Sequence, residues 1–134
     1  MGITVAVRSR VPQVTTLMRE RAALVVEKVA RDIERDAKLA APIDTGLLKN
    51  SIKAAPVTEL HWEVHSPVNY SAVMEYGSAP HIIRARNKKA LFWAGAKHPV
   101  AEVHHPGTKA RPYMTPAAER HAPTFREAMR RIFR

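Results

Sequence analysis

The sequence predicts an α+β domain in which a long N-terminal helix and a C-terminal helix pack on a small antiparallel β-sheet. Apolar residues recur every three or four positions in the first third of the chain, they alternate around Trp62, and a Thr-Pro pair at Thr115 is typical of a helix start. The 134 residues can bury one core, so we expect a single domain over 1–134. Its parts are an N-terminal arm at 1–10, a long helix at 12–41, a short helix and the sheet at 42–114, and a C-terminal helix at 115–134.

The long helix is predicted from one continuous apolar stripe. From Val14 onward this stripe consists of Leu17, Met18, Ala22, Val25, Val29, Ile33, Ala37 and Ala40. Pro12 suits the first turn, and Pro42 ends the helix. Two oppositely charged pairs at i,i+4 support its wetter side: Glu27 with Arg31, and Glu34 with Lys38. Such a helix spans about 40 Å, so most of the stripe should cover the sheet while one end is long enough to reach a neighbouring subunit.

A helix start and a half-buried strand should follow. Asp44 is placed to cap the amides of a short helix that has Gly46 in its first turn. Around Trp62, apolar residues alternate with polar ones over 60–65, which is the period of a strand with one buried face. The segment 70–76 then predicts a short helical turn that Gly77 closes.

Three more strands are expected, at 81–85, 90–94 and 99–104, with a basic turn at 86–89 between the first two. Together with the strand around Trp62 they would form one antiparallel sheet.

The C-terminal helix is predicted from its first residues. Thr115 and Pro116 make an N-cap and first-turn pair. Pro123 is expected to kink or divide the helix, with Thr124 and Glu127 forming a second capping box.

No recognised catalytic or cofactor pattern occurs in the chain. The absence of cysteine excludes disulfides and thiolate sites, and the serines and five glycines form neither a nucleophile elbow nor a phosphate-binding loop. Glu59, Glu63 and Glu75 are not paired at a defined spacing, so we interpret them as surface or interface charges. His104 and His105 would point to opposite faces of a strand, which argues against a metal site. We therefore expect no enzymatic activity, no metal and no cofactor, and the lack of an apolar run of about 18 residues predicts no membrane span.

Positive charge is concentrated in the second part of the chain. Residues 1–80 carry ten Lys/Arg against nine Asp/Glu, a net charge of +1, whereas residues 81–134 carry twelve against three, a net charge of +9. Such clustering suits contact with a polyanion, because neutralising phosphates releases counterions. It equally suits a solvated surface or an interface with acidic proteins.

Three short strings occur in a fixed order along the chain. The first is Asp44-Thr45-Gly46, the second is Glu75-Tyr76-Gly77, and the third is His105-Pro106-Gly107-Thr108 followed by Arg111-Pro112-Tyr113-Met114. Gly107 follows a proline, where a turn can require positive φ. Over roughly residues 10–120, this order resembles a family of neck and tail-completion proteins from long-tailed double-stranded DNA phages. Ser78 departs from that family's usual threonine and keeps the hydroxyl.

The resemblance implies a structural virion protein that joins the head connector to the tail tube around the DNA path, as a head-tail connector, a neck component or a tail-completion (terminator-like) ring. It implies a homo-oligomer, with a hexameric ring as the expected form because the tail tube is six-fold. Further implied partners are head-completion (stopper), tail-terminator and tail-tube proteins. The implied location is the virion neck or tail, after assembly in the host cytoplasm. The residues alone leave one alternative, a small basic nucleic-acid-binding toxin or regulator.

Two sets of site residues follow from these hypotheses. The predicted turn and assembly residues are Asp44, Thr45, Gly46, Tyr70, Glu75, Tyr76, Gly77, Pro106, Gly107, Pro112 and Tyr113. The residues predicted to face passing double-stranded DNA, without reading its sequence, are Lys88, Lys89, Lys97, Lys109 and Arg111.

Overall fold

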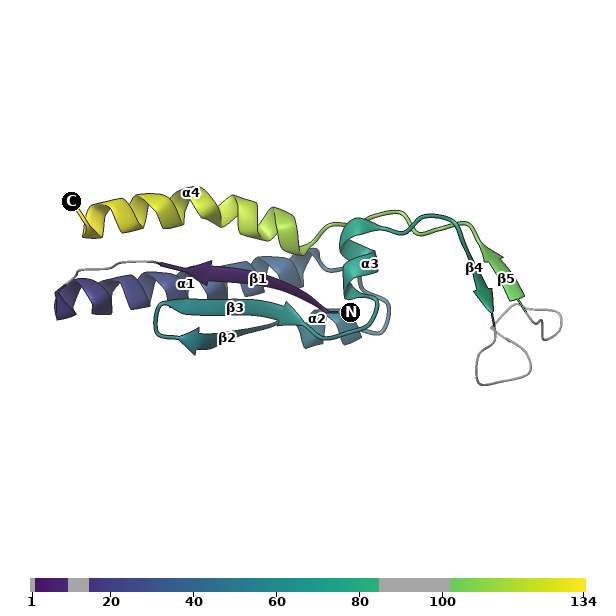
Figure 1. Cartoon of the computed structure of the whole chain (residues 1–134), viewed down its shortest axis with the longest axis horizontal. Coiled ribbons are helices and arrows are strands. Elements are labelled where there is room, and N and C mark those ends of the chain that lie inside the picture. Colours follow the sequence, from purple (N-terminus) through teal and green to yellow (C-terminus); the bar gives the residue numbers. More distant parts are fainter. Residues whose placement is uncertain (1, 10–14, 85–101) are drawn as a thin grey trace.

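The computed structural model of the chain describes residues 2–9, 15–84 and 102–134. Two long helices and a three-stranded sheet form a body, and a two-stranded ribbon projects from one end of it (Figure 1). The elements in chain order are β1 (Ile3–Arg8), α1 (Thr16–Ala40), α2 (Leu47–Ser51), β2 (Lys53–Thr58), β3 (His61–Ser66), α3 (Ser71–Tyr76), β4 (His81–Arg84), β5 (Glu102–His105) and α4 (Met114–Ile132). The predicted α+β class, with long N-terminal and C-terminal helices on a small antiparallel sheet, is confirmed.

α1 begins where Thr15 caps it, because the Thr15 hydroxyl accepts a hydrogen bond of 3.2 Å from the Met18 amide. Its predicted start at residue 12 is wrong, because Thr15 is extended and the helix begins at Thr16, whereas its end before Pro42 is confirmed. The buried stripe is slightly rotated from the predicted one, since Leu17 is 54% exposed. The buried residues are Ala22, Val26, Val29, Ala30, Ile33 and Ala37.

The main sheet is antiparallel with strand order β1-β3-β2. The N-terminal segment is therefore no free arm: Ile3, Val5 and Val7 alternate with polar or small residues, and this period makes β1 an edge strand beside β3. β2, the other edge, was not predicted, because Pro56 and two alanines give it little strand propensity. The predicted single sheet is thus wrong, since β4 and β5 pair only with each other among the described strands.

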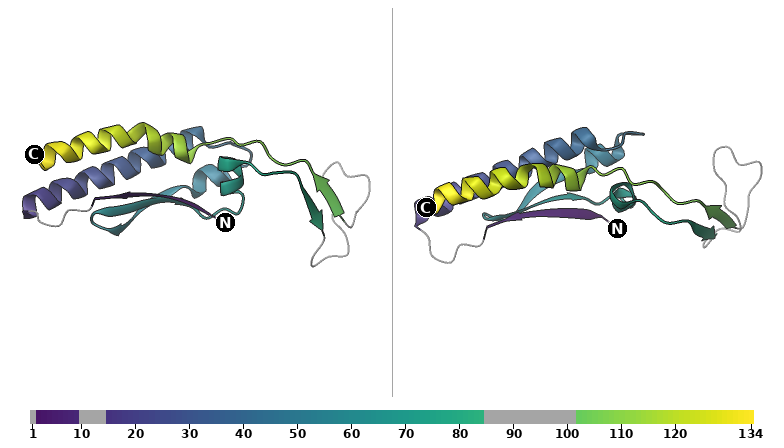
Figure 2. Two further views of the ribbon diagram at one scale, coloured as in Figure 1. Left: turned by 45° about the horizontal axis from the view of Figure 1, so that its top comes forward. Right: turned by 90° about the horizontal axis from the view of Figure 1, so that it is seen from above.

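Both long helices lie on the same side of the three-stranded sheet (Figure 2). The core between the layers contains Trp62 and Val64 from β3, together with Ile52 at the end of α2. Each fully buried Val or Ile side chain stabilises the fold by about 1.5–3 kcal/mol. The opposite face of the sheet carries mainly polar side chains, including Thr4 and His65, whose side chains are 2.7 Å apart.

A carboxylate on α1 ties that helix to β2. Glu34 accepts hydrogen bonds of 2.7 Å from the Lys38 ammonium and 2.7 Å from the Ala54 amide. Burial alone would raise the pKa of Glu34, but these bonds outweigh it and lower the pKa. The predicted pair Glu34–Lys38 is therefore confirmed, as is Glu27–Arg31 at 3.1 Å.

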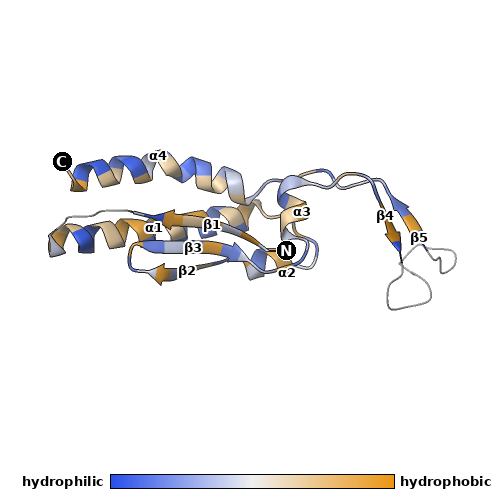
Figure 3. Ribbon diagram, in the orientation of Figure 1, coloured by the Kyte–Doolittle hydropathy of each residue, from blue (hydrophilic) through white to orange (hydrophobic). Residues whose placement is uncertain are grey.

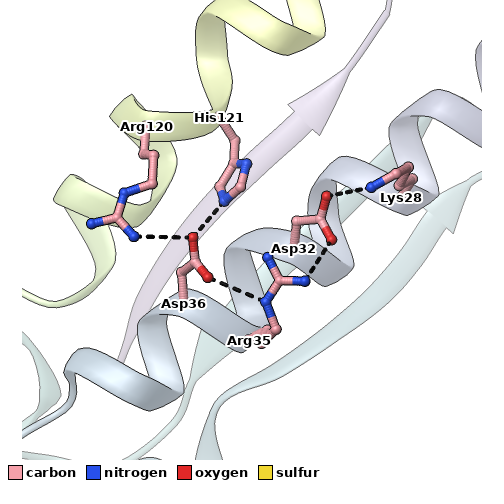
Figure 4. A network of polar contacts seen from close by, with 6 residues as sticks. All are labelled: Lys28, Asp32, Arg35, Asp36, Arg120 and His121. Atoms are coloured by element: carbon pink, nitrogen blue, oxygen red, sulfur yellow. Dashed lines mark hydrogen bonds and ion pairs between the residues drawn. The ribbon is translucent and has the colours of Figure 1, made fainter.

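A polar network joins α1 to α4 (Figure 4). Asp36 accepts a hydrogen bond of 2.6 Å from His121 Nε2 and lies within 3.4 Å of an Arg120 nitrogen. The bond from His121 is the main cause that lowers the pKa of Asp36, against a smaller opposing effect of burial. Because Asp36 is late in α1 and His121 is early in α4, the two helices run antiparallel, and the end of α4 lies beside the start of α1 (Figures 1 and 2).

α4 is one uninterrupted helix from Met114 to Ile132, so the predicted division at Pro123 is wrong. Pro123 lies on the exposed side, where water can bind the carbonyl group that has no proline N–H to accept from. Thr124 is consequently inside the helix, and no second capping box forms with Glu127. The helix also begins at Met114 and not after Thr115, because Glu75 of α3 accepts hydrogen bonds from its first amides.

Candidate assembly site at the root of the ribbon

The β4–β5 ribbon extends away from the body, and the core formed by the described residues includes no residue of β4 or β5 (Figures 1 and 2). All four residues of β4 are exposed, including Ile82 at 47% and Ile83 at 38%. Since consecutive strand residues point to opposite sides, each face of the ribbon presents an isoleucine; β4 is correspondingly apolar in Figure 3. An isolated two-stranded ribbon is only marginally stable in water. Its exposed isoleucines make the ribbon a candidate surface for contact with another molecule.

We define the root of the ribbon as Gly77, Ser78, Gly107 and Thr108. Its two glycines allow the two backbone segments to approach closely. The Ser78 and Thr108 amides donate to each other's carbonyl oxygens at 2.9 and 3.0 Å. Gly107 has φ +92°, and a Cβ there would lie 2.5 Å from the Ser78 carbonyl oxygen. Gly77 has φ +74°, and a Cβ there would lie 2.6 Å from the Thr108 carbonyl oxygen. Both positions therefore require glycine, and the predicted positive φ at Gly107 is confirmed.

Glu75 connects the root of the ribbon to α4. Its carboxylate is buried, at 2% exposure, and accepts hydrogen bonds of 2.8 Å from each of the amides of Tyr113, Met114 and Thr115. These amides open α4, so a side chain from α3 caps a helix that begins 39 residues later in the chain. The Tyr113 hydroxyl donates back to the Ser71 carbonyl at 3.1 Å. α3 and the start of α4 are thereby fixed to each other.

Around neutral pH, Glu75 is ionised and the Tyr113 hydroxyl is protonated. Burial raises the pKa of Glu75, but the hydrogen bonds from the Thr115 side chain and the three amides outweigh burial, so the pKa is lowered overall. Burial, followed by the neighbouring Glu75 charge, raises the pKa of Tyr113 to about 12. Glu75 is thus a charged helix cap, and its interpretation as a surface or interface charge was wrong. Thr115 was also wrongly predicted as the N-cap, because Glu75 satisfies the amides that an N-cap would bind.

The Asp44-Thr45-Gly46 string lines a groove of about 480 Å³ together with Arg111 from the third string. Gly46 has φ +83° and is itself the N-cap residue of α2, which has no side-chain capping bond. The groove combines exposed apolar groups with one acidic and one basic side chain, since Ile43 is 67%, Leu47 56% and Tyr70 39% exposed. Its lining is Pro42, Ile43, Asp44, Thr45, Gly46, Leu47, Leu48, Tyr70, Met74 and Arg111.

Asp44→Ala should change the free energy of unfolding by less than about 0.5 kcal/mol. The predicted cap at Asp44 is contradicted, because α2 has no side-chain cap and the nearest bond to its amides is from Leu47 to the Thr45 hydroxyl at 3.4 Å. Chemical denaturation of the parent and variant measures this difference. A loss of about 1 kcal/mol would show that Asp44 caps the helix after all.

The remaining predicted residues are divided between the root and its surroundings. Tyr76 is 69% exposed beside Gly77, and Pro106 and Pro112 are exposed on the segment that connects β5 to α4. Lys109 and Arg111 are exposed next to the root, and the Arg111 amide donates to the Met74 carbonyl at 2.7 Å. The predicted strand at 90–94, the basic turn at 86–89 and the residues Lys88, Lys89 and Lys97 lie outside the described residues.

The histidines on the ribbon serve its structure. The rings of His81 and His105 stack across the two strands with centroids 4.8 Å apart, and His105 Nδ1 accepts the Gly107 amide at 3.0 Å. Within 2–9, 15–84 and 102–134, no group of three His, Cys, Asp or Glu side chains is arranged to hold a metal ion. The same ranges contain no helix that is both long and apolar enough to cross a membrane.

The strings singled out in the sequence do lie at this site, but the hydrogen bonds from the amides of α4 to Glu75 were not predicted. The strings around Glu75 and Tyr113 meet through a hydrogen-bonded cap, while those around Gly77 and Gly107 meet across the ribbon. The structure begins α4 at Met114, and the residue before it, Tyr113, has no side chain suited to capping. Such a helix needs a remote acceptor.

Comparison of the chain with known proteins identified no relative. No family model matches the chain, and neither a curated protein nor a solved structure is significantly similar to it.

Proposed function

We propose that this chain is a structural protein of the neck or tail of a tailed double-stranded DNA phage, where it forms a ring of identical subunits as a head-tail connector or tail-completion component. The order of the three strings is what points to this family, and the ribbon is the observation that carries the assembly role. A ribbon with an exposed isoleucine on each face, held rigidly at its root, suits insertion against a neighbouring subunit. The proposal assigns no catalytic role to any residue.

Ring formation also accounts for other exposed features of the body. β1 and β2 are both edges of the main sheet, and unpaired edges favour contact with further protein. The groove beside the root exposes Ile43, Leu47 and Tyr70. Because the ribbon and these surfaces are different parts of one subunit, contacts between them are head-to-tail, which is the kind of interface that closes into rings.

Replacing both ribbon isoleucines, Ile82→Asn with Ile83→Asn, should abolish the ring without unfolding the body. Both side chains are exposed, so the variant loses contact area between subunits and little of its own core. Native mass spectrometry and electron microscopy of the purified chain measure the assembly, and thermal unfolding measures the fold. Leu24→Asn, at a residue that is 66% exposed on α1, is the control for the loss of an exposed apolar side chain.

The outcomes separate the hypotheses. Closed rings from the parent and from Leu24→Asn, with monomers from the ribbon variant, support the proposal. Rings that persist in the ribbon variant would remove the ribbon from assembly. Mass spectrometry of purified virions tests the function itself, because a neck or tail protein must be present in a fixed copy number per particle.

A further inference from the structure

An arginine-rich surface lies at the end of the body opposite the ribbon. The start of α1 and the end of α4 lie side by side there in all views, and the Arg19–Glu59 ion pair of 3.0 Å places the β2–β3 turn at the same end. Arg8 is also close to this turn, because it pairs with His61 in the sheet register. The exposed cations of this surface, which we call the arginine end, are Arg8, Arg19, Arg21, Arg126, Arg130, Arg131 and Arg134.

The arginine end has a net positive charge after its ion pairs are counted. Glu59 pairs with Arg19, and Glu127 lies 3.4 to 3.5 Å from Arg131 and Arg130. Arg8, Arg21, Arg126 and Arg134 form no ion pair within the described part of the chain. Glu20, which is exposed between Arg19 and Arg21, offsets one of these four charges, so a net excess of three positive charges remains for an external anion.

Helix stability explains only part of this arrangement. Arg130 and Arg131 in the last turn of α4 complement its dipole. Near the start of α1, in contrast, the dipole favours acidic residues, yet its first turn has none, and the first acidic residue, Glu20, lies between Arg19 and Arg21. Arg126 and Arg130 are also one helical turn apart, where like charges destabilise a helix. Helix stability therefore does not explain the positions of Arg21 and Arg126, which points to a binding role.

We propose that the arginine end binds the phosphate backbone of double-stranded DNA without reading its sequence. Every cation in the set is arginine, whose planar guanidinium binds phosphate through two hydrogen bonds. The inference takes from the proposed function only the choice of duplex DNA as the polyanion. It assigns the DNA contact to the end of the body opposite the ribbon, whereas the predicted residues Lys109 and Arg111 lie next to the ribbon root.

Fluorescence anisotropy with the full chain and several unrelated labelled duplexes tests this assignment over a range of salt concentrations. The triple variant Arg21→Gln, Arg126→Gln, Arg134→Gln removes three cations without breaking an ion pair seen within the described ranges. The matched control Lys49→Gln, Lys53→Gln, Lys109→Gln removes the same charge elsewhere on the surface. Thermal unfolding verifies that both variants are folded.

The arginine variant should bind each duplex about tenfold or more weakly, with a salt slope smaller by about 3. The control should stay within about threefold of the parent. Equal losses in both variants would mean that total charge alone binds DNA and would overturn the assignment. It would also be overturned by sequence-selective binding, or by polyglutamate competing as well as duplex DNA, which would indicate an acidic protein partner. The ribbon variant, which should not form rings, should still bind DNA, so failure of ring assembly and failure of this inference are distinguishable.

Discussion

Replacing Glu75 with alanine should lower the free energy of unfolding by about 3 kcal/mol. The variant loses a buried carboxylate that accepts three hydrogen bonds of 2.8 Å from the amides that open α4. Those amides would lose their acceptor in a region where water has little access, because Tyr113 and Met114 are fully buried. Chemical denaturation monitored by circular dichroism measures the change.

The pH dependence of Glu75→Gln tests the same contact by its charge. Because the folded protein lowers the pKa of Glu75 below its ordinary value of 4.5, the charge stabilises the fold above the unfolded-state pKa. That contribution is lost as the pH falls through the lower folded-state pKa. The stability difference between parent and Glu75→Gln should therefore be largest near neutral pH and shrink in acid.

Glu119→Ala is the control for these variants, because Glu119 is an exposed carboxylate on α4, the helix that Glu75 caps. It should change stability by less than about 0.5 kcal/mol. Similar losses from Glu75→Ala and Glu119→Ala, or a Glu75→Gln difference that does not depend on pH, would contradict the role of Glu75 as a charged cap.

Gly107→Ala should open the root of the ribbon, at a local cost of about 3 kcal/mol or more. Two effects add at this position: φ is +92°, and the new Cβ would lie 2.5 Å from the Ser78 carbonyl oxygen. Since this oxygen belongs to the backbone of the paired strand, the clash can be relieved only by separating the strands. Hydrogen exchange at the Ser78 and Thr108 amides should become faster, and ring assembly should decrease more than helical content.

Gly46→Ala separates the two effects. Gly46 has a similar φ of +83°, but the nearest atom to a new Cβ is Asn50 Nδ2 at 3.6 Å, an ordinary contact. This variant should lose only about 1–2 kcal/mol from the backbone conformation. Unchanged exchange at Ser78 and Thr108 in Gly107→Ala would disprove the clash at the ribbon root.

Local sequence signals were sufficient for the elements whose own residues determine them. The apolar stripe predicted α1, alternation around Trp62 predicted β3, and the turn preference of Gly107 predicted its positive φ. In each case the decisive interactions connect residues close together in the chain: a helical repeat, a strand period, or a backbone conformation that only glycine adopts without strain.

Tertiary contacts decided the rest, because burial and hydrogen-bond partners depend on residues distant in sequence. From the sequence, Glu75 was interpreted as a surface charge, but in the fold its carboxylate accepts hydrogen bonds from three amides at the start of α4. The N-terminal segment forms β1 by pairing with β3, which lies more than 50 residues later in the chain. The arginine end likewise forms only because antiparallel packing places the end of α4 beside the start of α1. Periodicity and turn chemistry within the sequence were enough to predict the long helices, strand β3 and the turn at Gly107. The Glu75 cap, the edge strands of the main sheet and the arginine end depend on the folded chain, because their interacting residues are far apart in sequence.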